Sequence, residues 1–123
     1  MRFCRPDRVV DHLQNILLAI AHINQYLEGH DESSFLSNNL VQDAVIRNLE
    51  VIGEGLHKIE VDAPEFRAAH LDLPWDEAYG MRNLLIHGYF DVRPEIVWAT
   101  VTENLPVLRK QLDQIFSATT APG

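Results

Sequence analysis

The densest group of side chains able to do chemistry lies in the run Met-Arg-Asn-Leu-Leu-Ile-His-Gly-Tyr at residues 81–89. A helix turns about 100° per residue, so Asn83 and His87, four residues apart, share one face, and Arg82 flanks it. A histidine that titrates near neutral pH can accept or donate a proton, and an arginine can hold a phosphate and stabilise charge that builds on it. The three side chains therefore suit cleavage of RNA by its own 2′-hydroxyl, without a metal ion.

The same spacing also has an ordinary structural interpretation. His87 falls in the last turn of a predicted helix, where a histidine commonly interacts with free carbonyls and the helix dipole. An arginine at position 82 commonly pairs with a nearby carboxylate. Arg-x4-His is a short pattern that arises often by chance, so spacing alone leaves both interpretations open.

Four long helices are needed to position this segment. Apolar residues recur at helical spacing along most of the chain and predict helices over about Pro6–Glu28, Asn39–Glu60, Trp75–His87 and Pro94–Ser117. The polar stretch 29–38 indicates a loop, and the stretch 61–74 predicts one short turn near 65–70. No useful strand-like alternation occurs. The sequence predicts an all-α, antiparallel bundle of four long helices plus a short one, as one domain over 1–123 with its core at about 7–117.

Three features interrupt the predicted helices. Gly53 and Gly55 lie inside the second one, where each costs up to about 1 kcal/mol relative to alanine, and close approach of another helix is the usual reason to keep them. Pro106 lies inside the last helix, lacks a backbone donor and predicts a kink. Leu84 and Leu85 are expected to anchor the third helix in the core. Residues 118–123 are expected to form a frayed tail.

Composition limits the classes of function. The chain has 123 residues, a net charge of −8 at pH 7 and a single cysteine, Cys4. One cysteine excludes an internal disulfide framework, and a reducing cytoplasm fits best. No apolar run reaches the roughly 18 residues of a membrane helix, and no signal peptide is expected. The acidic charge argues against indiscriminate nucleic-acid binding, although a local basic pocket can act within an acidic protein.

Two further patterns have simple alternatives. Glu54 and His57 form a Glu-x-x-His pair, which supplies ligands in di-iron bundles, but such a site needs a second copy that this chain lacks, so no metal site is expected. Trp75 and Trp98 are expected to anchor the core or an interface rather than to stack on bases.

The pattern R-x4-H-x-Y, formed by Arg82, His87 and Tyr89, resembles the signature of HEPN domains, specifically of the HepT-like toxin family. The stretch 47–54 resembles that family's second helix, and the stretches 94–98 and 104–106 resemble its last. The likeness covers about residues 7–116, nearly the whole chain.

The resemblance implies a helical homodimer whose two R-x4-H-x-Y sites face each other across a cleft. It implies a metal-independent endoribonuclease without a cofactor, the toxin of a toxin–antitoxin pair, with Arg82, Asn83 and His87 at the site. The implied partner is a nucleotidyltransferase antitoxin of the MNT type, which would adenylylate Tyr89. The added AMP would bring bulk and negative charge to the site and compete with an RNA phosphate.

The second helix offers one more candidate group. Arg47, Glu50 and Glu54 share one helix face and form either a solvated row of ion pairs or, since the family places this helix against the motif helix, part of the cleft lining through Arg47 and Glu54. A competing hypothesis for the whole protein is a catalytically idle module that docks the nucleotidyltransferase and presents Tyr89, motivated by the acidic surface.

Overall fold

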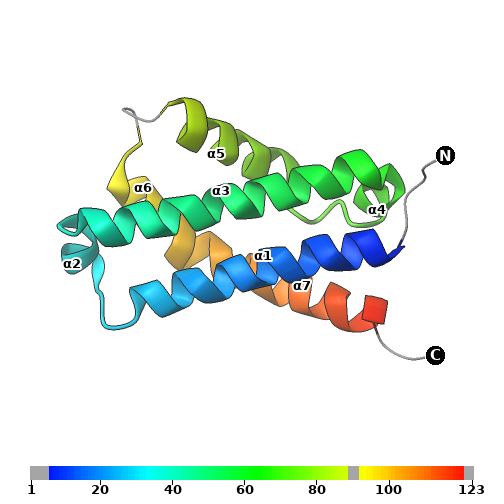
Figure 1. The fold of residues 1–123 in the computed structure, drawn as a ribbon, viewed down its shortest axis with the longest axis horizontal. Helices are drawn as coiled ribbons and strands as arrows, with labels where there is room; N and C mark the ends of the chain where they lie inside the picture. Colours follow the sequence, from blue (N-terminus) through cyan, green and yellow to red (C-terminus); the bar gives the residue numbers. More distant parts are fainter. Residues whose placement is uncertain (1–5, 89–91, 121–123) are drawn as a thin grey trace.

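The computed structural model describes residues 6–88 and 92–120. Three long helices are α1 (Pro6–Leu27), α3 (Asn39–Asp62) and α5 (Trp75–His87). The fourth long helical segment consists of α6 (Pro94–Ala99), a π-helical turn (Thr100–Asn104) and α7 (Leu105–Thr120). Successive long helices run in opposite directions (Figure 1), and the described residues contain no strand. The predicted all-α bundle of four long helices is confirmed.

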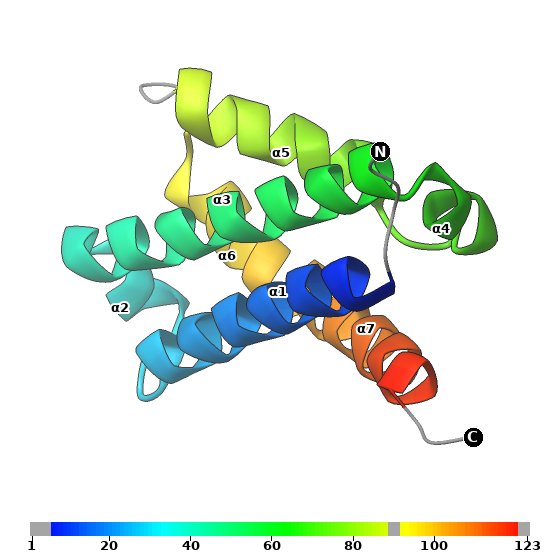
Figure 2. The same ribbon diagram turned by 45° about the vertical axis from the view of Figure 1, so that its right-hand side comes forward.

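The helix α3 lies in the middle of the bundle, with α1 on one side and α5 on the other (Figures 1 and 2). α7 packs along α1. The main contact of α5 is with α3, so the helix that carries the candidate residues stands at the edge of the bundle. The apolar faces of these helices form one core, whose fully buried large side chains are Phe35, Leu13, Ile16, Ile20, Ile23, Leu56, Ile59, Leu85, Leu112, Val45 and Val97.

The stretch 29–38, expected to be a loop, contains a short helix, α2 (Glu32–Leu36). Asp31 caps its start, because the backbone N–H of Ser34 donates to Asp31 Oδ1 over 2.9 Å. That hydrogen bond lowers the pKa of the Asp31 carboxyl. Phe35 is fully buried in the core, and Gln42 Nε2 donates to Phe35 O over 2.9 Å at the other end. The loop prediction is therefore wrong here, since one buried aromatic side chain and two caps suffice to hold a single helical turn.

The connection between α3 and α5 holds the short helix α4 (Pro64–Ala69), close to the predicted turn. Arg67 of α4 forms ion pairs with Glu60 of α3 and, over 3.3 Å, with Asp76 of α5. The neighbouring Glu60 carboxylate raises the pKa of the Arg67 guanidinium. α4 thus links the two helices on which the candidate site depends.

A π turn interrupts the last predicted helix just before Pro106, so that Pro106 lies in the first turn of α7 rather than inside a regular helix. The hydroxyls of Thr100 and Thr102 donate to the carbonyls of Ile96 and Trp98, each over 2.8 Å, and such bonds weaken the regular helical ladder. The N–H of Leu105 bonds back to Thr100 O, five residues away.

The end of the last helix differs slightly from the prediction. α7 continues to Thr120, so the tail expected from residue 118 is helical over 118–120, while residues 121–123 lie outside the described part. In the described part, no helix is both long and apolar enough to cross a membrane.

Candidate functional site

The site begins where α3 and α5 touch. A Cβ added at Gly53 would lie 2.6 Å from Arg82 Cβ and 2.8 Å from Ala78 O, both on α5. A Cβ added at Gly55 would lie 2.6 Å from Ile16 Cγ1 on α1. The predicted close helix packing at these glycines is confirmed, and it occurs on both sides of α3. The absence of a side chain at position 53 brings the Ala78 carbonyl and the base of the Arg82 side chain directly against α3.

Arg82 is held by two neighbours. Its Nη2 lies 2.9 Å from Glu54 Oε1 on α3, and its Nη1 donates to Asn83 Oδ1 over 2.8 Å. The guanidinium carbon also lies 5.8 Å from the centre of the Tyr79 ring. Arg82 Nε is buried and has no hydrogen-bond partner among the described residues. Both ends of the guanidinium are therefore oriented by protein groups, while one donor is left unused.

A hollow of about 360 Å³ opens beside Arg82, between α1, α3 and α5. It holds three cationic side chains, two carboxylates and an apolar patch, and its lining is His12, Asn15, Arg47, Glu50, Val51, Glu54, Gly55, Lys58, Arg82 and Ile86. Arg47 and Glu54 thus line the same hollow as Arg82. Arg47 also pairs with Glu50 over 3.6 Å while remaining 73% exposed, so the ion-pair row and the shared lining occur together.

His87 lies in the last turn of α5 and is exposed. It makes no hydrogen bond or ion pair with another described side chain, and it does not line the hollow. Asn83, one turn earlier, is half-buried and occupied by Arg82. The structure therefore brings Asn83 and Glu54 into contact with Arg82, and His87 lies at the helix end without a side-chain partner in the described part of the chain. Tyr89 lies outside the described residues.

The two leucines between Asn83 and His87 have different surroundings. Leu85 is buried, as expected, but Leu84 is 39% exposed, and the prediction that it anchors the core is wrong. α5 contacts mainly α3, so only a narrow strip of its surface is covered. Ile86 is also exposed, at 42%. Two exposed apolar side chains therefore lie near His87, Leu84 one turn before it on the same face and Ile86 on the side of the hollow.

Glu54 and His57, the Glu-x-x-His pair, have separate partners. Glu54 binds Arg82, whereas His57 Nδ1 lies 3.2 Å from Glu60 Oε2 and the imidazole stacks on Tyr79 with the ring centres 4.2 Å apart. No cluster of three or more acidic, histidine or cysteine side chains in the described part could hold a metal ion.

The tryptophans serve the core, as predicted. Trp75 is buried and its Nε1 donates to His70 O over 2.8 Å. Trp98 packs partly buried against Phe35, with ring centres 5.3 Å apart. Trp75 is therefore closed to stacking on a base, while Trp98 uses part of its ring to pack on the core.

Sequence reasoning missed Lys58, Asn15 and His12 as members of the hollow. Lys58 follows Arg47 by eleven residues and Glu54 by four, so the spacing that grouped those two on one face of α3 also includes Lys58. The α1 residues carry no such signal, because the sequence does not show which face of α1 meets α3.

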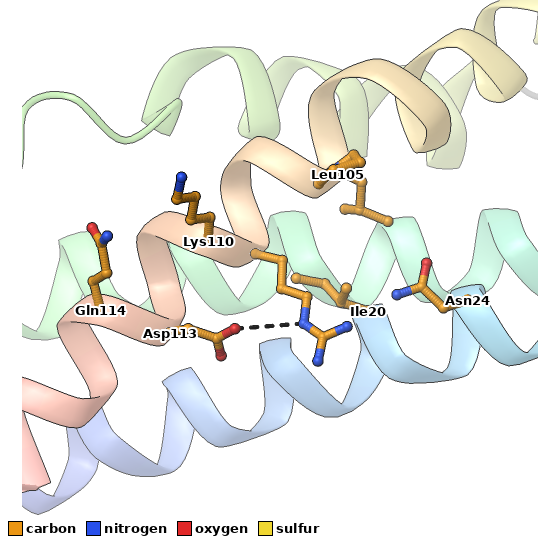
Figure 3. Close-up of a pocket in the computed structure, with 8 residues that line it drawn as sticks. Ile20, Asn24, Leu105, Lys110, Asp113 and Gln114 are labelled. Atoms are coloured by element: carbon orange, nitrogen blue, oxygen red, sulfur yellow. Dashed lines mark ion pairs between the residues drawn. The ribbon is translucent and has the colours of Figure 1, made fainter.

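Two other hollows lie away from this site. One, between α1 and α7, is shown in Figure 3, with Ile20 and Asn24 on α1 and Leu105, Lys110, Asp113 and Gln114 on α7 among its lining. Its Arg109 is paired with Asp113 over 3.5 Å. The other is mainly apolar and lies between α3, α5 and the π turn, with Met81 and Leu108 in its walls. Neither contains Arg82 or His87.

An antiparallel helical bundle whose edge helix carries an Arg-x4-His pair is the architecture of the HEPN class. The chain belongs to the HepT-like ribonuclease family, whose model, "Ribonuclease HepT-like", matches residues 16–115. The comparison of this chain with solved structures found no match.

Proteins similar to this chain agree with that assignment. "Probable ribonuclease HepT" of Thermococcus cleftensis is 37% identical over 85% of this chain and 93% of its own length. "Putative RNase TTE0752" of Caldanaerobacter subterraneus is 35% identical over 85% of this chain and 90% of its own. "Gamma-glutamylcyclotransferase and putative RNase MJ0434" of Methanocaldococcus jannaschii is a longer protein, 35% identical, of which the match covers 46%.

Proposed function

We propose that this protein is a metal-independent endoribonuclease that acts as the toxin of a toxin–antitoxin pair. The observation that carries the proposal is the orientation of Arg82, fixed by Glu54 and Asn83 beside a hollow, on the same helix as an exposed His87 that has no side-chain partner among the described residues. This arrangement offers a cation for a phosphate and a group that can transfer a proton. Membership of a ribonuclease family supports the ribonuclease part of this proposal.

The proposed chemistry uses the ribose itself as the nucleophile. His87 accepts the proton of the 2′-hydroxyl, the 2′-oxygen attacks the adjacent phosphorus, and the bond from phosphorus to the 5′-oxygen breaks. The products are a 2′,3′-cyclic phosphate and a 5′-hydroxyl, which receives its proton from a second imidazole. Arg82 stabilises the charge on the phosphoryl oxygens in the transition state. No step needs a metal ion.

The need for a second imidazole favours a homodimer in which two sites face each other. The exposed Leu84, three residues before His87 on the same helix face, supports this, since contact between the two copies of this apolar side chain would bring the two α5 ends together. The partner's His87 then supplies the second proton-transfer group.

The first prediction concerns cleavage. Purified protein should cleave RNA in the presence of EDTA, and Arg82→Ala or His87→Ala should lower the rate by at least about 100-fold, the range of a proton-transfer or phosphate-stabilising group. Cleavage of a fluorescently labelled RNA, with His22→Ala and Arg109→Ala as controls, measures this. Loss of cleavage in EDTA, or full activity of His87→Ala, would contradict the mechanism.

We further propose that an MNT-type nucleotidyltransferase transfers AMP to Tyr89, two residues beyond His87. The competing hypothesis, an idle docking module, is favoured by the net charge of −8 and by the carboxylate that already occupies Arg82. Mass spectrometry after incubation with ATP and such an enzyme, on the unchanged protein and on Tyr89→Phe, tests the transfer. Transfer to Tyr89 without any RNase activity of the unmodified protein would support the idle module instead.

A further inference from the structure

We infer that the hollow between α1, α3 and α5 binds the RNA strand next to the cleaved bond, and that Lys58 and Arg47 contact phosphates on the two sides of Arg82. This inference rests on the proposed ribonuclease function and assigns a path to its substrate.

The first argument is position along α3. Arg47, Glu54 and Lys58 lie on one face of this helix, and all three line the hollow with Arg82. At 1.5 Å per residue, Arg47 and Lys58 are about 16 Å apart along the axis, and Arg82 contacts α3 at Glu54, between them. The three cations therefore form a row, with the proposed catalytic arginine in its interior. A nucleic-acid strand presents its phosphates as such a row.

The second argument is charge. The chain carries a net charge of −8, yet this hollow has three Arg or Lys side chains and only two carboxylates, Glu50 and Glu54. Each carboxylate is engaged by an arginine. Lys58 is exposed and forms no ion pair with any described residue. An ammonium on a flexible stem without a protein partner is suited to bind a phosphate from solution.

The third argument is size and lining. About 360 Å³ falls within the range of pockets that hold small ligands. Val51 and Ile86 supply apolar surface for the face of a base, and the Asn15 amide on α1 offers both a donor and an acceptor. The contents of the hollow thus match the parts of a nucleotide: a phosphate, a ring face and polar edges.

The test separates RNA binding from catalysis. Binding of a labelled single-stranded RNA is measured by fluorescence anisotropy over a salt series, in protein carrying His87→Ala so that the RNA stays intact. Lys58→Gln should weaken binding about fivefold and lower the slope of log affinity against log salt by about one, as loss of one phosphate contact does. Arg47→Gln should act in the same direction.

The chain offers matched controls on α7. Lys110 is an exposed lysine like Lys58, and Arg109 pairs with a carboxylate of its own helix as Arg47 does. Lys110→Gln and Arg109→Gln should leave affinity within about twofold of the parent. The side chains replaced in the two test variants and the two control variants are all exposed, so the thermal melting curves of the four variants should agree with that of the parent. In protein with His87 intact, Lys58→Gln should raise KM and leave kcat unchanged, since it removes uniform binding.

Equal effects of Lys58→Gln and Lys110→Gln, in a protein that binds and cleaves RNA, would overturn this inference and leave the proposed ribonuclease standing. A parent protein that neither binds nor cleaves RNA would instead overturn the proposed function, and the inference with it.

Discussion

At the scale of the residue, the site depends on how Arg82 is held. Glu54 on the neighbouring helix and Asn83 on its own helix each take one end of the guanidinium. Arg82 and Glu54 are both partly exposed, so their ion pair adds little to folding stability. Its main consequence is geometric, because it fixes the direction in which the remaining N–H groups point.

This gives a prediction for Glu54. Glu54→Ala should lower the single-turnover cleavage rate about tenfold, since Arg82 loses its orienting partner, whereas Glu54→Gln, which keeps a hydrogen-bond acceptor, should stay within about threefold. Glu65→Ala, on the short α4, serves as a control for loss of one acidic side chain. A faster Glu54→Ala enzyme would show that the carboxylate competes with the RNA phosphate rather than positioning Arg82.

The sequence predicted part of this arrangement. Four-residue spacing correctly placed Asn83 and His87 on one face of α5. Seven-residue spacing placed Arg47 and Glu54 on one face of α3, and that face does line the hollow beside Arg82. Spacing could not predict that Arg82 would turn toward Asn83, its own neighbour in the chain, because that depends on side-chain torsions. It also could not show that Leu84 is exposed, since the exposed width of α5 is set by how few helices cover it.

At the scale of the element, two glycines allow α3 to pack closely against the helices on both of its sides. Gly53 faces α5 and Gly55 faces α1, and a Cβ at either would enter the neighbouring helix. The sequence predicted the long helices well because their apolar stripes extend over many turns. It did not predict α2, which has one helical turn and one buried apolar side chain, Phe35, too few for a periodicity to emerge.

The prediction at this scale concerns Gly53. Gly53→Ala should destabilise the protein by about 1–2 kcal/mol, because the strain of overpacking against Ala78 O exceeds the gain in helix propensity. Urea unfolding of both the parent and the variant measures the difference. The same variant should also lower cleavage, because Arg82 moves with α5.

Gly80 provides the matched control. It lies in α5, and a Cβ there would meet nothing within 4 Å. Gly80→Ala should therefore stabilise the protein by up to about 1 kcal/mol through helix propensity alone. Equal stabilisation by Gly53→Ala and Gly80→Ala would contradict this prediction, because it would mean that α5 can shift away from the added methyl group at little cost.

At the scale of the whole molecule, the position of α5 at the edge of the bundle matters most. One side of this helix packs on α3, and its last turns expose His87 and the apolar Leu84. A solitary bundle would leave that apolar surface in water. Pairing of two copies would cover it and would assemble the two imidazoles that the proposed cleavage requires.

We therefore expect Leu84→Asp to shift the protein from dimer to monomer and to lower cleavage by at least about tenfold, since a buried charge opposes the apolar contact. Light scattering after size-exclusion chromatography measures the mass, over a range of protein concentrations. Val107→Asp, at an exposed apolar position on α7, should leave both mass and activity unchanged. A monomeric parent protein with full activity would exclude the paired site.

The π turn sets the rotational phase of the last helix. Its i→i+5 hydrogen bond gives it one residue more than an α-helical turn. The buried side chains before, within and after it follow one another at steps of four, four, three and four residues and all face the core: Val97, Val101, Leu105, Leu108 and Leu112. Removing one residue from this turn would restore regular winding and rotate everything beyond it by about 100°. Leu108 and Leu112 would then leave the core. The chain length between α6 and α7 is therefore as constrained as the identity of any core side chain, even though the turn itself is polar and mostly exposed.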